Sequence, residues 1–133
     1  MNQLLRTIIS VPRNIAPAFV SGGTGWTVLN PDGTHIVTFG DGSARFQSDT
    51  TSPVLTLRAS ILTSGRRFRI TFPVIQHSSG QVQFDIVGAT VIVPSGVGLF
   101  TTTFVASSAL LSIYRATANV DLTLGDIIVR QVG

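Results

Sequence analysis

The chain has 133 residues, no cysteine and a formal charge of +3, from nine arginines and six aspartates with no lysine or glutamate. The missing cysteine excludes disulfides and cysteine-held zinc, and so low a charge does not form the dense basic stripe that nucleic-acid binding needs. No stretch reaches the roughly 20 apolar residues of a membrane span, so we expect neither a nucleic-acid partner nor a membrane one.

The residue types favour strands over helices. Lysine and glutamate are typical of helix surfaces, whereas the Thr, Val, Ile and Phe that dominate here suit a pleated sheet. A chain of this length can bury a full core as one domain without disulfides or a metal. The composition therefore predicts a single all-β domain, a β-sandwich that needs no cofactor.

Residues 1–18 differ from the rest of the chain, because they mix apolar residues with arginine and with Pro12 and Pro17. Proline removes a backbone donor and disfavours helix in the residue before it. We expect an extended N-terminal arm over 1–18, followed by a sandwich domain over 19–133. Such an apolar arm must be covered, either by the edge of the sandwich or by another subunit.

After the arm, short runs of strand-forming residues alternate with turn signals such as Asn30-Pro31-Asp32-Gly33 and a turn at 77–80. In the clearest run, Phe68, Ile70, Phe72 and Val74 alternate with polar residues and should point inward. Val82, Phe84 and Ile86 repeat that pattern. The predicted strands are 26–29, 35–39, 44–46, 54–58, 67–74, 81–86, 91–93, 100–105, 110–114, 120–124 and 127–132. Strands at this spacing are typical of a sandwich or jelly roll.

Five sequence motifs resemble those of the galactose-binding-like β-jelly-roll, a fold of carbohydrate-binding modules and phage virion proteins. They are FVSGGTGW at 19–26, GSARF at 42–46, GRRFRITF at 65–72, GLFTTTF at 98–104 and DIIV at 126–129. The resemblance covers about residues 19–132 and implies a jelly-roll sandwich. It also implies that Trp26, in the Gly-Trp motif, anchors the core. Fold alone does not decide function.

No set of residues points to catalysis, so we do not expect an enzyme. The six aspartates are scattered rather than paired as a glycosidase requires, and neither His35 nor His77 adjoins a nucleophile motif. Related jelly rolls often hold calcium near the closing strand, where Asp126 lies. One aspartate does not supply the six to eight oxygens of a calcium site. We expect no metal and interpret Asp126 as an acceptor of backbone hydrogen bonds.

A polar face could bind a glycan if the strands at 67–74, 81–86 and 100–105 share one sheet. Its candidate residues are Arg67, Arg69, Gln81, Gln83, Asp85 and Tyr114, with Thr101 and Thr103 beside them. The alternative is that these residues are an ordinary solvated sheet face, on which Arg69 and Asp85 form a cross-strand ion pair.

The main functional hypothesis is a structural virion protein, a phage capsid cement or decoration subunit assembled in the host cytoplasm. Hydrophobic residues make up 44% of the chain and charged residues 11%, which favours burial in an assembly. The expected partners are the major capsid protein and sister subunits, in a homotrimer. The alternative is a carbohydrate-binding module or a tail attachment protein that recognises a host glycan. The arm would contact the shell through Leu4, Leu5, Arg6, Ile8, Ile9, Val11 and Arg13.

Overall fold

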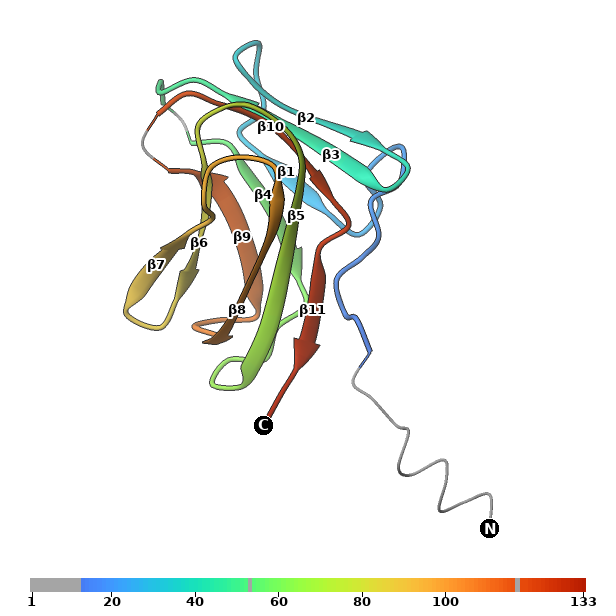
Figure 1. Cartoon of the computed structure of the whole chain (residues 1–133), viewed down its shortest axis with the longest axis vertical. Helices are drawn as coiled ribbons and strands as arrows, with labels where there is room; N and C mark the ends of the chain where they lie inside the picture. The colour runs from blue at the N-terminus through green and yellow to red at the C-terminus, as the bar shows by residue number, and fades with distance from the viewer. Residues whose placement is uncertain (1–12, 53, 117) are drawn as a thin grey trace.

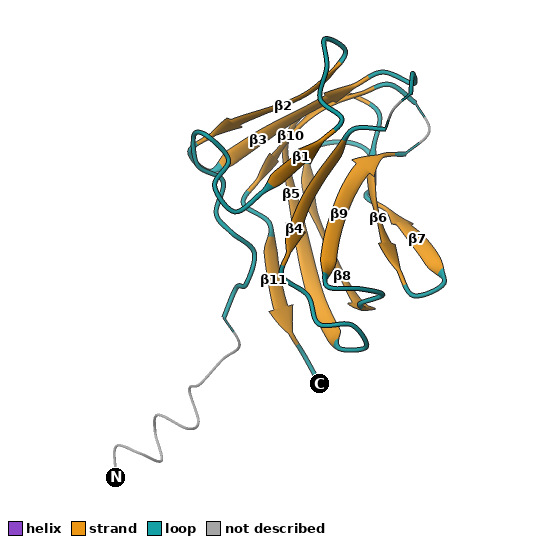
Figure 2. Ribbon diagram, turned by 180° about the vertical axis from the view of Figure 1, so that it is seen from behind, coloured by secondary structure: helices purple, strands orange, loops and turns teal. Residues whose placement is uncertain are grey.

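Two antiparallel β-sheets face each other in the computed structural model, which describes residues 13–52, 54–116 and 118–133 (Figures 1 and 2). The described part of the chain has no helix long and apolar enough to cross a membrane. The strands are β1 Thr27–Leu29, β2 His35–Gly40, β3 Ser43–Ser48, β4 Thr56–Ser60, β5 Arg67–Ser79, β6 Val82–Ile86, β7 Ala89–Ile92, β8 Gly98–Val105, β9 Leu110–Arg115, β10 Val120–Gly125 and β11 Ile128–Gln131. The predicted all-β jelly-roll sandwich is confirmed.

The strand order mixes distant parts of the sequence. One layer, called sheet A below, has the order β1-β4-β9-β6-β7. The other, sheet B, has the order β11-β5-β10-β3-β2, with β8 also paired to β5. In sheet B, β10 and β11 follow one another along one edge of β5, and β8 lies along its other edge. Most neighbours in each sheet are therefore remote in sequence.

The core lies between the sheets and follows the period-two pattern of the strands. Phe68, Ile70 and Phe72 of β5 are buried, as the alternation predicts. Phe84 of β6 packs against Phe72 of β5 and Phe104 of β8, with ring centroids 5.2 and 5.3 Å apart. These aromatic contacts join sheet A to sheet B and fix which side chains of each strand face outward.

Strand β5 is longer than the sequence predicts, and the turn predicted at 77–80 is wrong. β5 continues to Ser79 because β10 supplies partners for its last residues, pairing Leu122 with His77 and Asp121 with Ser79. The reversal is left to Gly80, whose φ is +71°. A β-carbon there would lie 2.2 Å from the Asn119 carbonyl oxygen, so only glycine fits this approach.

The described end of the N-terminal segment lies along the edge of sheet B beside β11 (Figure 1). The Ile15 amide donates to the Val129 carbonyl at 2.9 Å, and the Asn14 side chain accepts from the Val129 amide at 2.8 Å. For these residues the sandwich edge, one of the two predicted covers, is the one observed. Arg13 is exposed. The other predicted arm residues, Leu4, Leu5, Arg6, Ile8, Ile9 and Val11, lie outside the described residues.

Trp26 and Asp126 have the structural roles that the sequence analysis gave them. Trp26 is buried against Phe19, with ring centroids 5.2 Å apart, and its indole N–H donates to the Pro17 carbonyl at 3.1 Å. The Asp126 carboxylate accepts a hydrogen bond from the Phe19 amide at 2.7 Å. Both interactions tie the segment before β1 to the sandwich, so the predictions of a core anchor and of a backbone acceptor are confirmed.

These contacts predict different effects for two N-terminal deletions. Removing residues 1–12 keeps all of these hydrogen bonds, so that truncated chain is the reference for the comparison. Removing residues 1–18 also deletes the hydrogen bonds of Asn14, Ile15 and Pro17, each worth about 1 kcal/mol. We expect a loss of about 2–4 kcal/mol, measured by denaturant unfolding. Equal stability of the two truncated chains would contradict this role of the segment.

Candidate functional site

The polar face predicted from the sequence is divided between the two sheets. Arg67 and Arg69 lie on β5 in sheet B, whereas Gln83 and Asp85 lie on β6 in sheet A. The predicted cross-strand pair of Arg69 and Asp85 is therefore wrong. Arg69 is opposite Thr103 and Arg130, and Asp85 is opposite Thr90. The three strands do not share one sheet, because alternation specifies the face of a strand and not its neighbours.

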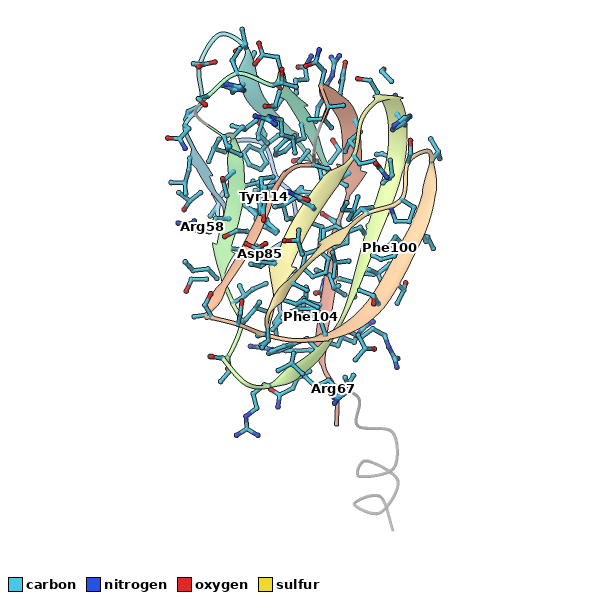
Figure 3. All side chains as sticks on the ribbon, turned by 90° about the vertical axis from the view of Figure 1, so that its left-hand side faces the viewer. Arg58, Arg67, Asp85, Phe100, Phe104 and Tyr114 are labelled. Atoms are coloured by element: carbon cyan, nitrogen blue, oxygen red, sulfur yellow. The ribbon has the colours of Figure 1, made fainter. Side chains whose placement is uncertain are left out.

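The structure does bring Gln83, Asp85 and Tyr114 together, on the outer face of sheet A. Asp85 and Tyr114 lie side by side in Figure 3. Tyr114 of β9 is opposite Gln83 of β6. Ser112, two residues before Tyr114 and on the same face, is opposite Arg58 of β4. Gln81 precedes β6 and uses its side-chain amide to donate to the Val93 carbonyl at 3.3 Å. The candidate site, called the Tyr114 face below, is therefore built by the three adjacent strands β4, β9 and β6.

Asp85 holds Tyr114 in place. The phenol hydroxyl donates to Asp85 Oδ1, which also accepts from the Thr90 hydroxyl of β7 at 3.1 Å. Burial raises the pKa of Tyr114 above its ordinary value of 10.0, and the hydrogen bond to the Asp85 carboxylate raises it further. The aromatic ring is thus a neutral, half-buried surface of fixed orientation, and it needs little ordering when a ligand binds.

Arg58 adds a cation to this face and is not among the residues predicted from the sequence. Its Nε donates to the Ser112 hydroxyl at 3.0 Å, and its terminal nitrogens make no hydrogen bond to any described residue. The signal was present in the alternation of β4, where Leu57 and Ala59 are buried and Arg58 lies between them. That alternation predicts that Arg58 points outward, but only the pairing of β4 with β9 places Arg58 beside Ser112 and near Tyr114.

The other polar cluster is buried and has the character of a structural element. His35 of β2 is fully buried, with Nδ1 2.8 Å from the Ser48 hydroxyl and Nε2 3.3 Å from that of Thr51. Asp49 Oδ1 is 3.7 Å from Nε2. A serine, a histidine and an aspartate thus meet, but Ser48 is only 4% exposed and cannot reach a substrate. This cluster joins β2 to β3 and the loop after it.

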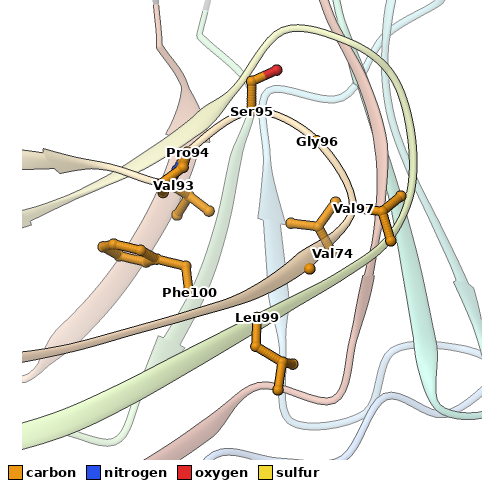
Figure 4. A pocket seen from close by; sticks show the side chains of 9 residues that line it. Val74, Val93, Pro94, Ser95, Gly96, Val97, Leu99 and Phe100 are labelled. Atoms are coloured by element: carbon orange, nitrogen blue, oxygen red, sulfur yellow. The ribbon is translucent and has the colours of Figure 1, made fainter.

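The hollows beside β8 offer few polar side chains to a ligand, and the metal-ligand residues of the described chain are scattered. A cavity of about 120 Å³ lies beneath the loop between β7 and β8, lined by Val74, Val93 and Phe100 among others (Figure 4). It is smaller than the roughly 300 Å³ at which ligand pockets begin. A second hollow, of about 350 Å³, lies at the end of β8 and is lined by Arg67, Ile86, Val87, Thr103, Phe104 and Val105. In the ranges 13–52, 54–116 and 118–133, no three His or Asp side chains are grouped so that they could hold a metal ion.

Solved structures share this fold, although no protein-family model and no curated protein matches the sequence. A family 29 carbohydrate-binding module complexed with cellulohexaose matches with a TM-score of 0.57 and 10% identity, over 93% of this chain and 94% of that one. A Clostridium thermocellum xylanase, whose family 22 binding module and catalytic module are complexed with xylohexaose, gives 0.53 and 16% over 92% and 28%. The enzymatically active domain of tailspike protein 4 of bacteriophage CBA120 gives 0.53 and 13% over 82% and 20%. The chain therefore spans just over a quarter of the xylanase chain and about a fifth of the tailspike chain.

These matches establish the fold of the chain. Sequence identities of 10–16% show nothing beyond the fold. They are carbohydrate-binding modules and a phage tailspike domain, all sandwiches of the jelly-roll type. The resemblance to that fold stated from the sequence motifs is thus confirmed.

The raised pKa of Tyr114 can be measured directly, because the chain contains a single tyrosine. In the native protein, tyrosinate absorbance should appear at a higher pH than in the unfolded chain. Asp85→Asn should lower the pKa of Tyr114, although burial keeps it above 10.0. The Thr90 hydroxyl lowers this pKa, so Thr90→Val should raise it. Because the pKa of Tyr114 is higher in the folded chain than in the unfolded one, the neutral phenol stabilises the fold. This stabilisation is fully present below about pH 10 and is lost as the pH rises through the folded pKa.

The two substitutions therefore shift the titration in opposite directions, which a general loosening of the fold would not do. Identical titration curves for the native and unfolded chains would show that the hydroxyl of Tyr114 is not held as described.

Proposed function

We propose that this protein is a non-catalytic carbohydrate-binding module and that the Tyr114 face is its binding surface. The observation that carries the proposal is the fixed aromatic ring of Tyr114, held by Asp85 and flanked by Arg58 on an exposed sheet face. A flat apolar surface beside a hydrogen-bond acceptor and a cationic donor has the chemistry that a sugar requires. One face of a sugar ring presents C–H groups, while its rim presents hydroxyls.

Each side chain has a separate task in this proposal. The Tyr114 ring removes the C–H face of one sugar ring from water and packs against it. Asp85 Oδ2, which makes no hydrogen bond to a described residue, accepts from a sugar hydroxyl. The terminal nitrogens of Arg58 donate to a second oxygen. Hydrogen bonds to charged groups are about twice as strong as neutral ones, so Arg58 and Asp85 set orientation and selectivity.

The structural neighbours support this choice of ligand class. Four structures of the family 29 module are variants described as probing the mechanism of ligand recognition, with an arginine, an aspartate, a tyrosine or a lysine replaced. The Tyr114 face presents an arginine, an aspartate and a tyrosine. This chain has no lysine, so no lysine can contribute to binding here.

The findings favour this reading over the capsid cement hypothesis. Binding to the major capsid protein, a homotrimer and a place in the virion stay predictions of the sequence, since no structural observation tests them. A glycan-binding domain presented on a phage tail is compatible with the present proposal, because it uses the same surface. The tailspike domain among the neighbours has the same fold.

The proposal is tested by titrating the full chain with cellulohexaose and xylohexaose, the oligosaccharides bound in two neighbours, and by screening a glycan array. Tyr114→Ala should weaken binding of the best ligand at least tenfold, through loss of the stacking surface. Arg58→Ala should weaken it about tenfold to a hundredfold, because hydrogen bonds to charged groups contribute about 1.5–3 kcal/mol.

Arg69→Ala is the control, because Arg69 is also an arginine in the middle of a strand, but it is exposed and lies on sheet B. Its affinity should equal that of the parent chain. Binding that Arg69→Ala reduces and Tyr114→Ala does not would move the site to sheet B. An array without any bound glycan would refute the proposed function.

A further inference from the structure

Strand β8 leaves one side of sheet B open. It has eight residues, Gly98–Val105, and pairs only with β5 among the strands of the described chain. The other strands at sheet edges are shorter: β1 has three residues, β7 four and β2 six. The edge of β11 is covered by residues 14–15. β8 is thus the longest strand whose second edge has no neighbouring strand in the described part of the chain.

The backbone groups that face the open side can be identified from the register. The Val132 amide donates to the Arg67 carbonyl, so the backbone groups of Arg67 and of alternate residues after it point toward β11. Those of Phe68, Ile70 and Phe72 consequently point toward β8. Their opposite residues on β8 are Phe104, Thr102 and Phe100. By the same alternation, the amides and carbonyls of Leu99, Thr101 and Thr103 point away from β5.

This edge lacks the usual protection of an exposed strand. Native proteins blunt such edges with lysine, proline, bulges or inward-pointing charges. Residues 98–105 contain no charged residue and no proline, and their pairing with β5 is regular. An unprotected edge presents a ready template for another strand.

The most exposed large apolar side chains of the described residues gather at the same edge. They are Leu99, which is 76% exposed, Val97 at 70% and Val87 at 60%. Val97 lies directly before β8, and the Val87 amide reaches the Val105 carbonyl at the other end of the strand. Exposed apolar groups concentrated in this way mark an interaction surface.

We propose that β8 pairs with β8 of a second copy of this chain, antiparallel and centred on Thr101. In this register Thr101 of one copy is opposite Thr101 of the other, and Leu99 of each copy is opposite Thr103 of the other. The backbone groups of these three residues point away from β5, so they form hydrogen-bonded pairs across the interface, with about six bonds in total. The register also places Val97 of one copy opposite Val105 of the other, next to Val87. The edge is therefore complementary to itself in backbone groups and in apolar side chains, as a two-fold interface requires.

The pairing has a consequence for the Tyr114 face, which rests on the proposed function. Antiparallel strands in one continuous sheet are related by a two-fold axis perpendicular to that sheet. Both copies of sheet A therefore lie on the same side of the extended sheet B, and both Tyr114 faces point in the same direction. Such a dimer would bind a glycan-covered surface through two sites at once.

The test is the solution mass of the full chain by light scattering over a range of protein concentrations. We expect a concentration-dependent twofold increase in mass. Thr101→Lys, which puts a charge in the middle of the edge, should keep the mass of one chain. The control is Thr38→Lys, because Thr38 is also an exposed threonine on an edge strand of sheet B, β2, and should leave the twofold increase intact. A single-chain mass at all concentrations, a three-chain mass, or a dimer unaffected by Thr101→Lys would overturn the proposal.

Amide hydrogen exchange gives a second readout that does not depend on a variant folding. The amides of Thr101 and Thr103 should be protected at high concentration and exchange freely at low concentration, while that of Thr102 stays protected by β5 throughout. Protection of Thr101 in a single chain, lost when residues 1–12 are deleted, would assign the edge to the N-terminal segment and refute the dimer. Neither measurement involves a glycan, so a failure of the proposed function leaves this test valid.

Discussion

The contact of Phe84 with Phe72 and Phe104 is the interaction on which the rest of the structure depends. It is made between the layers, with ring centroids 5.2 and 5.3 Å apart, and locks β6 of sheet A over β5 and β8 of sheet B. Because side chains of a strand alternate strictly, burying Phe84 turns Asp85 outward, and burying Phe104 turns Thr103 outward. The outward direction of Asp85 on the candidate binding face and that of Thr103 on the open edge are both consequences of this packing.

The sequence was sufficient for the parts of the fold that depend on local pattern. Alternation in β5 and β6 predicted their buried faces, and the scarcity of charged and helix-favouring residues predicted the all-β class. The pairing of strands remote in sequence lay beyond it. β6 pairs with β9 and not with β5, so Asp85 joined Tyr114 as predicted but was separated from Arg69. Alternation carries no information about which strands are neighbours. A site whose residues come from several strands therefore cannot be predicted from alternation alone.

The Tyr114 face also shows why its members were harder to find than a catalytic motif. No sequence spacing relates Arg58, Asp85 and Tyr114, since each comes from a different strand, and only the pairing of β4 with β9 and of β9 with β6 brings them together. The hydrogen bond from Tyr114 to Asp85 crosses between two of these strands. The same bond that stabilises the sheet therefore orients the ring, so the site is as rigid as the sheet that carries it.

A site with one aromatic platform has a limited affinity of its own, and this gives the open edge of β8 its significance. Stacking on a single ring and a few hydrogen bonds sum to a few kcal/mol after ordering costs, and a Kd of 1 mM already corresponds to about −4.1 kcal/mol. Joining two such faces makes the second contact intramolecular, at an effective concentration of the order of 1 mM or more, which raises avidity without any new contact to the sugar. The proposed binding face, with its limited affinity, and the proposed dimer, with both faces on one side, would therefore address the same energetic problem. Both follow from a sandwich whose core fixes every strand's orientation.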